Sequence, residues 1–375
     1  MVDLQIALRR MRSSRLTGTP FDTPTEAVAW HGAMQAQDYG PAKWSIGQRA
    51  AGLTDEDLDE ALASGSIIRT HVLRPTWHFV AKEDVRWLLA LTGPRVQQQV
   101  GPRYRQLGLD ERTRARCQEV IASALEGGNH LTRDGIAAVL DDARIDRAGQ
   151  RLPHILMHCE LEAAVCSGGL SGRKHTYALL DERVPDDRPF DRDEALVELT
   201  RRFLRSHGPA TVKDLRWWSS LRLADITRAL DLLGSEVRSR TVDGLTVWSI
   251  ATDTAPPPAA RGAHLLQAYD ELIVGYTESR FFADPRAQEE RAAWQDRGLP
   301  TGIVLLNGGV AGHWRRTVER RAVRIEAVLH DGPTRAALRA LEHAAADLGR
   351  FLAVMWRWKQ PGSEAIDPHA GAVGW

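Results

Sequence analysis

The sequence is poor in cysteine, and it contains no long apolar run. Its three cysteines, Cys117, Cys159 and Cys166, are odd in number and lack metal-ligand spacing, which favours reduced thiols over a disulfide framework. No apolar run approaches the roughly 20 residues that a membrane span requires. The first 15 residues are basic and amphipathic and lack a secretory apolar region. These features predict a cytoplasmic, nucleoid-associated protein with neither metal nor cofactor.

Lysine is also scarce, so arginine carries nearly all of the positive charge. The 49 basic residues balance 49 acidic residues, which at first argues against a nucleic-acid binder. Arginine presents a planar fork that matches phosphate oxygens, although a GC-rich genome would explain the same bias. The basic residues also cluster locally, at 95–116 and at 315–324. A neutral total with basic patches suits a groove that is lined on one face only.

Two glutamines stand two residues apart, just where an expected helix ends. Thr23 can cap that helix, Pro24 suits its first position and Glu26 can complete a capping box. Residues i and i+2 share a side only in an extended segment. If Gln35 and Gln37 act on one point, the backbone has therefore left the helix before it reaches them.

An amide pair limits the chemistry that this segment can perform. An amide offers two donors and an acceptor, but it has no useful basicity near neutral pH. It can hold a water molecule and stabilise a developing positive charge with its carbonyl oxygen. Such a pair suffices only where the leaving group departs easily, as a cationic alkylated base does from its sugar. The alternative is that both are ordinary polar residues at a helix end.

The segment 34–38 (Met-Gln-Ala-Gln-Asp) and the run 68–78 (Ile-Arg-Thr-His-Val-Leu-Arg-Pro-Thr-Trp-His) together resemble a family of bacterial winged-helix proteins. The characterised members of this AlkZ/AlkX-type family are DNA glycosylases for bulky alkylated purines and interstrand crosslinks. Their motif is Gln, an apolar residue, then Gln or Asp. The resemblance implies that Gln35 and Gln37 are catalytic. Gln at position 37 places the chain nearer the crosslink-unhooking, self-resistance branch, because the housekeeping branch typically has Asp there.

A chain of 375 residues should form two to four packed modules. The patterns predict a mainly α fold with β wings, in which three tandem winged helix-turn-helix modules and a small β-rich C-terminal region form a C shape. Residues 67–80 are expected to form the first wing, as two short strands around Leu73 to Pro75. The segment 93–107 holds Pro94, Pro102 and three consecutive glutamines, which favour a solvated helix face over a site. The expected modules are 1–109, 110–190, 191–255 and 256–375.

Several side chains outside the glutamine pair are candidates for contact with DNA. Trp77 can stack on a base or belong to a core, the two wing histidines can assist chemistry or be structural, and the glycine-rich tip at 167–174 can be a wing or a plain hairpin turn. Asp270 lies in an apolar run, where it can be a catalytic base, or more commonly cap a turn or pair with an arginine. The predicted DNA-binding residues are Arg69, His71, Arg74, Trp77, Arg173, Lys174, Arg315 and Arg316.

The favoured function is a monofunctional DNA glycosylase for cationic N7-alkylated purines in double-stranded DNA, acting as a monomer. Lys43 is the only lysine near the glutamine pair, so a Schiff-base lyase has weak support. The alternative is a winged-helix transcription regulator without catalysis, although no helix carries a clear set of groove-reading side chains and no dimerisation coiled coil is evident. A metal-dependent nuclease is disfavoured, because no carboxylate cluster or His/Asp ligand set is present.

Overall fold

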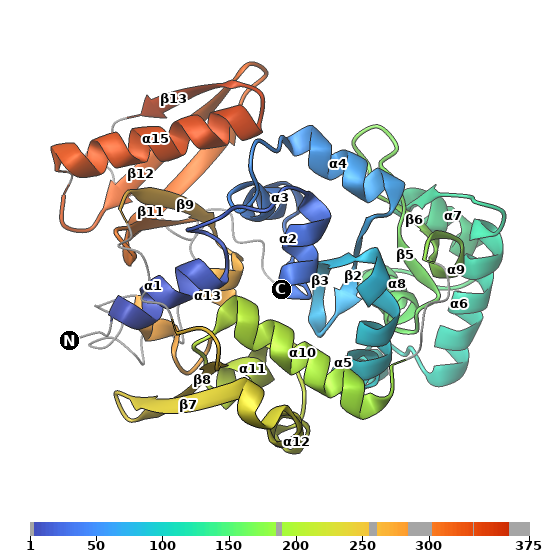
Figure 1. The fold of residues 1–375 in the computed structure, drawn as a ribbon. Helices are drawn as coiled ribbons and strands as arrows, with labels where there is room; N and C mark the ends of the chain where they lie inside the picture. The colour runs from blue at the N-terminus through green and yellow to red at the C-terminus, as the bar shows by residue number, and fades with distance from the viewer. Residues whose placement is uncertain (1–3, 185–189, 255–260, 284–301, 333, 360–375) are drawn as a thin grey trace.

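The computed structural model describes residues 4–184, 190–254, 261–283, 302–332 and 334–359 (Figure 1). Over these ranges the fold mixes helices with four small β-sheets. Within the described residues, no helix is both long and apolar enough to cross a membrane. The chain begins with helix α1 (Leu4–Ser13).

The first segment, from α2 to β3 (residues 24–81), holds the glutamine pair. Thr23 caps α2 by accepting a hydrogen bond from the backbone of Glu26, and Pro24 occupies the first turn, as the sequence predicts. A hairpin with its turn at Leu73 also forms where it was expected. The strand order is β1-β3-β2, so β1 is an edge strand. The elements are α2 (Pro24–His31), β1 (Met34–Gln35), α3 (Tyr39–Gly47), α4 (Asp55–Ser64), β2 (Ile67–Val72) and β3 (Arg74–Ala81).

The helix that follows the first hairpin contains two prolines. After a short 3₁₀ turn, η1 (Lys82–Asp84), helix α5 runs unbroken over Val85–Gln106 with Pro94 and Pro102 inside it. A proline inside a helix costs roughly 3 kcal/mol. The helix persists because its apolar face is buried in two hydrophobic cores, one with the second segment and one with the third. Gly93 permits close packing, since a Cβ there would lie 2.8 Å from the carbonyl oxygen of Leu161.

The second segment repeats the element order of the first. A helix, a short strand, two helices and a hairpin follow one another, and the strand order is β4-β6-β5. A single turn of helix, α9 (Leu180–Arg183), follows the hairpin. The elements are α6 (Glu111–Leu125), β4 (Leu131–Thr132), α7 (Arg133–Asp142), α8 (Arg151–Leu161), β5 (Val165–Ser167) and β6 (Thr176–Leu179).

The third segment follows the same order, with one isolated β-bridge in place of the short strand. Ala210 forms that bridge with Trp248, on the strand that also pairs with β7. The hairpin turns at Asp243-Gly244, as its sequence predicts. The elements are α10 (Arg192–His207), α11 (Val212–Ser219), α12 (Leu223–Leu233), η2 (Gly234–Glu236), β7 (Val237–Val242) and β8 (Leu245–Ile250).

The C-terminal region contains a five-stranded sheet of order β13-β12-β11-β10-β9, in which only the β12–β13 pair is parallel. Helix α15 packs on this sheet (Figure 1). The elements are β9 (Ala263–Gln267), α13 (Glu271–Val274), η3 (Arg280–Ala283), β10 (Gly302–Leu306), β11 (Gly309–Val318), β12 (Ala322–Leu329), α15 (Arg335–Phe351) and β13 (Met355–Lys359).

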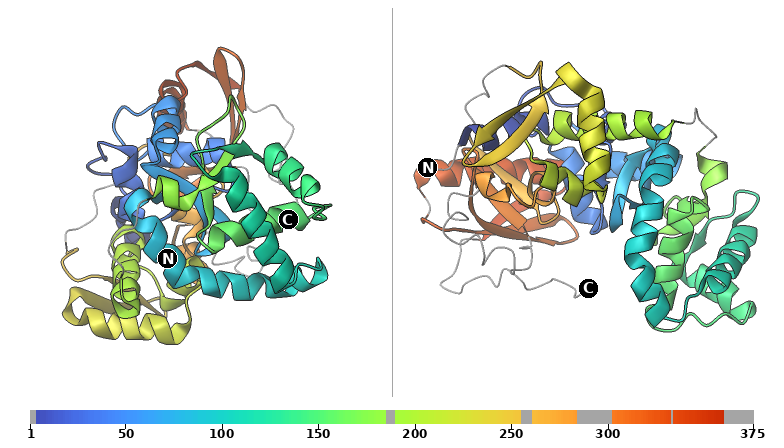
Figure 2. Two further views of the ribbon diagram at one scale, coloured as in Figure 1. Left: turned by 90° about the vertical axis from the view of Figure 1, so that its right-hand side faces the viewer. Right: turned by 90° about the horizontal axis from the view of Figure 1, so that it is seen from below.

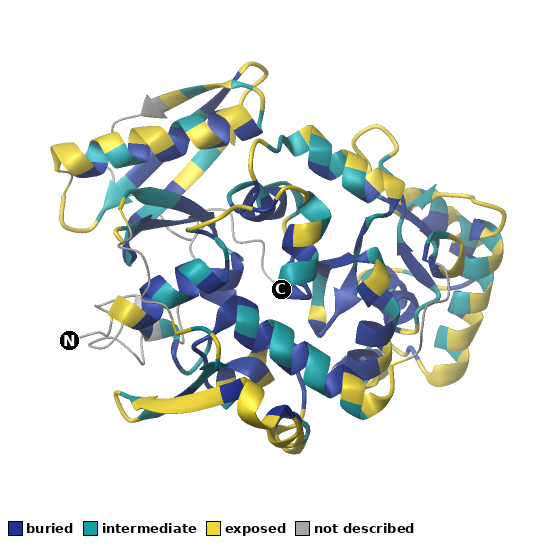
Figure 3. Ribbon diagram, in the orientation of Figure 1, coloured by how far each residue is buried: buried dark blue, intermediate teal, exposed yellow. Residues whose placement is uncertain are grey.

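The glutamine segment is enclosed by packing between the first segment and the C-terminal region. One apolar core joins α2, α3 and α4 to β9–β12 and α15. Helix α1 lies against the C-terminal region (Figure 2). Its residues Leu8 and Met11 pack with Leu266 and Ile273. Strands β2 and β3 are mostly buried (Figure 3). The short β1 strand is therefore held by elements more than 200 residues away in the sequence.

Candidate active site

The two glutamines lie in extended backbone beside strand β3. Helix α2 ends at Gly32, whose φ of 79° is one that glycine adopts at no steric cost. Gln35 pairs with His78, and the N–H of Ala36 donates to the carbonyl oxygen of Trp77 at 2.7 Å. The expectation that the backbone has left the helix before the glutamines is confirmed. Gln35 is 6% exposed, whereas Gln37 is only partly buried.

The Gln35 amide is oriented by a buried arginine. Nη2 of Arg74 donates to Oε1 of Gln35 at 2.8 Å and also lies 3.4 Å from Nε2 of His78. Because a guanidinium only donates, the oxygen of the amide must face Arg74, which leaves the NH₂ group of Gln35 pointing elsewhere. Burial, followed by the charge of Arg74, lowers the pKa of His78 to about 3, so this ring is neutral. Nδ1 of His78 therefore donates to the carbonyl oxygen of Thr76, and Nε2 accepts from Arg74.

The backbone of Gln35 is held by a second buried charge, that of Glu271. The N–H of Gln35 donates to Oε1 of Glu271 at 2.6 Å. Oε2 of Glu271 lies 3.1 Å from Nε2 of His207 and accepts from Nε1 of Trp218 at 2.9 Å. Burial alone would raise the pKa of Glu271, but the hydrogen bond and charge of His207, and then the charge of Arg74, lower it to about 2. Glu271 is therefore an ionised, fully buried carboxylate.

Gln37 is held more loosely and stands nearer the surface. Its Oε1 accepts from the backbone N–H of Trp77 at 3.3 Å, and its carbonyl oxygen accepts from Arg69 at 3.4 Å. Arg69 also donates to the carbonyl oxygen of Ala36 and lies 4.4 Å from the centroid of the Trp77 ring. Arg69 therefore supports the backbone on which Gln37 stands, and the NH₂ group of Gln37 has no hydrogen-bond partner in the described part of the chain.

An exposed carboxylate and an arginine from the C-terminal sheet stand beside the pair. Asp38 occupies the N-cap of α3, but its side chain makes no capping hydrogen bond. Desolvation raises the pKa of Asp38, while the charges of Arg316 and Arg69 oppose that rise. Nη2 of Arg316 lies 3.6 Å from the point that a Cβ on Gly40 would occupy. Arg316 is thus brought to the glutamine segment, which sequence separation gave no reason to expect.

The two remaining wing residues contact the second segment. Nδ1 of His71 pairs with Oε2 of Glu160, and Nε1 of Trp77 donates to Oε1 of the same carboxylate at 3.4 Å. The two rings also contact each other, with centroids 4.5 Å apart. His71 is buried and Trp77 partly buried, so both join the hairpin to α8. A contact of either residue with DNA stays a prediction.

The other predicted DNA-binding residues lie away from the glutamines, except Arg316. Arg173 and Lys174 are exposed at the tip of the β5–β6 hairpin, where Lys174 pairs with Asp134 at 2.7 Å. Arg315 is exposed on β11 and pairs with Glu326 at 2.6 Å. The DNA-binding role of these residues also stays a prediction.

Asp270 has the structural role that is common for such acids. It is fully buried, forms a bidentate ion pair with Arg49 at 2.7 and 2.8 Å, and caps α13 through the N–H of Leu272. The sequence drew attention to an acid in an apolar run, and the run holds two. The second, Glu271, is the one that contacts the glutamine segment, and no sequence pattern favoured it over Asp270.

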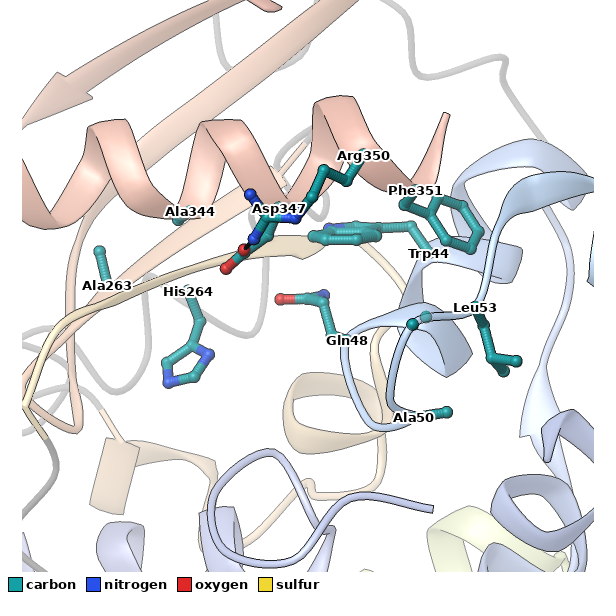
Figure 4. Close-up of a pocket in the computed structure, with 12 residues that line it drawn as sticks. Trp44, Gln48, Ala50, Leu53, Ala263, His264, Ala344, Asp347, Arg350 and Phe351 are labelled. Atoms are coloured by element: carbon teal, nitrogen blue, oxygen red, sulfur yellow. Dashed lines mark hydrogen bonds and ion pairs between the residues drawn. The ribbon is translucent and has the colours of Figure 1, made fainter. Parts of the chain in front are cut away.

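The structure also contains a cavity of about 360 Å³ near the C-terminal end of α3. Trp44, Gln48, His264 and Phe351 are among its lining residues, and neither Gln35 nor Gln37 lines it (Figure 4). Over the described ranges, no group of three or more His, Cys, Asp or Glu side chains could hold a metal ion.

Comparison with known proteins decides what kind of protein holds this site. A family model described as "DNA glycosylase AlkZ-like" matches residues 28–351, a span that includes both glutamines and the whole wing. The chain belongs to the AlkZ-like DNA glycosylase family. It is therefore an enzyme of DNA repair.

A curated protein and a solved structure, both from Streptomyces sahachiroi, are similar to this AlkZ-like glycosylase. A curated protein named "Interstrand DNA cross-link repair glycosylase" is 24% identical over 326 residues, which cover 83% of this chain and 86% of the relative. The solved structure of the Streptomyces sahachiroi DNA glycosylase AlkZ matches with a TM-score of 0.78 and 22% identity, and the match covers 96% of this chain and 99% of that one. The structural match shows a shared fold.

Proposed function

We propose that this AlkZ-like DNA glycosylase is monofunctional and hydrolyses the N-glycosidic bond of cationic N7-alkylated purines, including bulky adducts and interstrand crosslinks. Gln35 and Gln37 are the catalytic pair. One observation carries the proposal. Both amide oxygens accept a hydrogen bond from a group that can only donate, Arg74 for Gln35 and the Trp77 backbone for Gln37. Each amide therefore keeps a defined orientation, with one lone pair and its NH₂ group available.

The chemistry of the lesion makes this weak pair sufficient. A purine alkylated at N7 is already a cation, so it needs no strong acid to depart. The pair has to hold a water molecule and stabilise the positive charge that develops on the sugar. Gln37 is the more exposed of the two and is placed to contact that water, while Gln35 lies deeper and more rigidly held.

The surroundings of Lys43 support a monofunctional enzyme. A Schiff-base lyase needs an uncharged amine that can reach the sugar. Nζ of Lys43 pairs with Asp55 at 2.8 Å and with Asp59 at 2.7 Å, and its side chain is 4% exposed. This amine is held as a buried cation by two carboxylates, so it is not available for imine formation.

The repeated element order supports three winged-helix modules at 1–109, 110–190 and 191–255, followed by a β-rich region at 256–375. All three segments place two helices before a hairpin, an order that suits groove binding with a wing on the backbone. We assign contact with double-stranded DNA to Arg69, His71, Trp77, Arg173, Lys174, Arg315 and Arg316, whereas Arg74 orients Gln35. A C-shaped monomer that reads the lesion in place avoids flipping a crosslinked nucleotide, which is difficult.

Two observations favour crosslinked DNA as a substrate. Position 37 is Gln, and a curated relative bears the name of an interstrand cross-link repair glycosylase. Gln37 also favours a role in self-resistance to a genotoxin. A transcription regulator without catalysis is disfavoured, because the family to which the chain belongs is one of DNA glycosylases.

The direct test is base release from duplexes that carry N7-methylguanine or a nitrogen-mustard crosslink. Gln35→Ala with Gln37→Ala should slow release about 100-fold, the scale seen when a positioned catalytic dipole is removed. Gln98→Ala with Gln99→Ala is the matched control, since both of these glutamines are exposed on α5. Retained activity in the first double variant would refute the catalytic assignment.

A further inference from the structure

The N–H of Gln35 has no strand to pair with. Successive N–H groups of a strand point to opposite sides, and that of Ala36 points to β3. The N–H of Gln35 therefore points away from β3, and β1 is the edge of its sheet. A buried N–H without a partner is costly. Glu271 is the group that satisfies it, from 236 residues away in the sequence.

The carboxylate of Glu271 is itself fixed by the third segment. One of its oxygens accepts a hydrogen bond from the N–H of Gln35. The other accepts from Nε1 of Trp218 and lies 3.1 Å from Nε2 of His207. Oγ of Ser206 lies 2.7 Å from the carbonyl oxygen of Arg202 and 2.8 Å from Nδ1 of His207. Nε2 of His207 faces a carboxylate, which only accepts, so this nitrogen donates to Glu271.

The two ends of helix α13 hold the backbone and, through Arg74, the side chain of Gln35. Its first residue, Glu271, binds the Gln35 backbone. At its other end, the carbonyl oxygen of Val274 lies 3.5 Å from Nη1 of Arg74, whose Nη2 holds the Gln35 amide. The backbone and the side chain of one glutamine are thus held by two buried charges of opposite sign, and both charges are anchored to the same turn of helix.

We propose that Glu271 is a positioning residue for Gln35: its carboxylate, clamped by His207 and Trp218, sets the place of Gln35 and hence the rate of base release. This inference rests on the proposed catalytic role of Gln35. A misplacement of about 1 Å at a reacting centre can cost on the order of 100-fold in rate. Glu271 touches neither DNA nor water in this role, so its effect should appear in the chemical step and not in binding.

The test is single-turnover base release by Glu271→Gln on DNA carrying N7-methylguanine, with the dissociation constant for the same duplex measured in parallel. The substituted amide has one oxygen for three donors, so it must turn its NH₂ group toward at least one of them. The rate constant should fall about 10-fold to 100-fold, with the dissociation constant unchanged within about twofold. Trp218→Phe removes one hydrogen bond to Glu271 and keeps an aromatic side chain, so it should slow base release less than Glu271→Gln does. It also serves if Glu271→Gln fails to fold.

Asp214→Asn is the matched control. Asp214 is also a fully buried carboxylate that ties the third segment to the C-terminal region, through the backbone N–H groups of Thr277, Glu278 and Ser279. Among the described residues, it hydrogen-bonds to neither Gln35 nor Arg74. It should lower the melting temperature while leaving the rate per folded molecule unchanged. A Glu271→Gln enzyme that loses only stability, as this control does, overturns the inference.

Gln35→Ala separates the two possible failures. If Glu271 acts through Gln35, the Gln35→Ala, Glu271→Gln double variant should be no slower than Gln35→Ala within about twofold. A fully additive loss shows that Glu271 acts elsewhere and overturns the positioning alone. A wild-type rate for Gln35→Ala overturns the catalytic assignment and the positioning with it.

Discussion

Nη2 of Arg74 donates a 2.8 Å hydrogen bond to the side-chain oxygen of Gln35. The sequence presents Arg74 as a wing residue suited to phosphate. In the structure its side chain is 9% exposed and is shared among Gln35, His78 and the carbonyl oxygen of Val274. An arginine from the wing thus orients one of the two candidate catalytic amides. This relationship decides how substitutions at Arg74 should behave.

Arg74→Lys should slow base release more than it weakens DNA binding. A lysine keeps the charge but loses the fork that reaches Gln35 through Nη2 and the carbonyl oxygen of Val274 through Nη1. We expect about a 10-fold fall in the single-turnover rate constant, with the dissociation constant for the duplex little changed. Binding measured over a salt series is the check. If Arg74 contacts a phosphate instead, Arg74→Met should weaken binding and lower the slope of log K against log salt by about 1.

The β5–β6 hairpin tip should contact the DNA backbone without regard to the lesion. Arg173→Ala with Lys174→Ala is expected to weaken binding of alkylated and undamaged duplexes equally, and to lower the salt slope by up to about 2. Asp134→Asn is the opposite test. It releases Lys174 from its 2.7 Å ion pair and should tighten binding. Unchanged dissociation constants in both variants would show that the tip is a plain hairpin turn.

The unfolding free energy should fall in mild acid because two buried histidines are neutral. Burial lowers the pKa of His31 and of His78 from 6.5 to about 3. The contribution of each neutral histidine to the free energy of unfolding is fully present above pH 6.5. It is lost as the pH falls toward 3, because the unfolded chain binds a proton at higher pH than the folded chain does. The loss from pH 6.5 to pH 5 is roughly 2 kcal/mol for each histidine. Chemical denaturation at pH 7.5, 6 and 5 measures it.

His31→Gln should reduce the loss between pH 6.5 and pH 5 by roughly 2 kcal/mol, and an unchanged slope would contradict the assignment. Glu271 acts in a lower window. Its pKa is lowered from 4.5 to about 2, so its stabilising contribution is present above pH 4.5 and is lost as the pH falls toward 2. The histidine effect can therefore be measured first, between pH 7.5 and 5, where Glu271 stays ionised.

The Arg49–Asp270 ion pair should contribute to stability and not to proton transfer. Both side chains are fully buried, so Asp270→Leu alone leaves an unpaired buried charge, at a cost of roughly 3–5 kcal/mol. Arg49→Met combined with Asp270→Leu should recover much of that loss, because no charge is then stranded. Thermal unfolding of the single and double variants measures this. A double variant no more stable than Asp270→Leu would contradict it.

The parts of the fold that could be predicted from the sequence depend on interactions between residues close together in the chain. The cap at Thr23 and the hairpin turn at Leu73 depend on residues a few positions apart, and each formed where expected. The helix was expected to include Met34, but it ends at His31, and Met34 belongs to strand β1. In helix α5, two prolines disfavour a continuous helix, and burial of its apolar face in two cores outweighs them.

For the candidate site, the sequence determined the identity of the amide pair, its release from helical backbone and, through its motifs, the family. Only the tertiary structure decided what holds that pair. Glu271 reaches Gln35 across 236 residues, and Arg316 approaches Gly40 from the far sheet. Arg74, which the sequence presents as free to bind phosphate, is buried instead. The physical reason is that a cap or a turn is satisfied within a few residues, whereas a buried charge finds its partner only when distant segments have packed together.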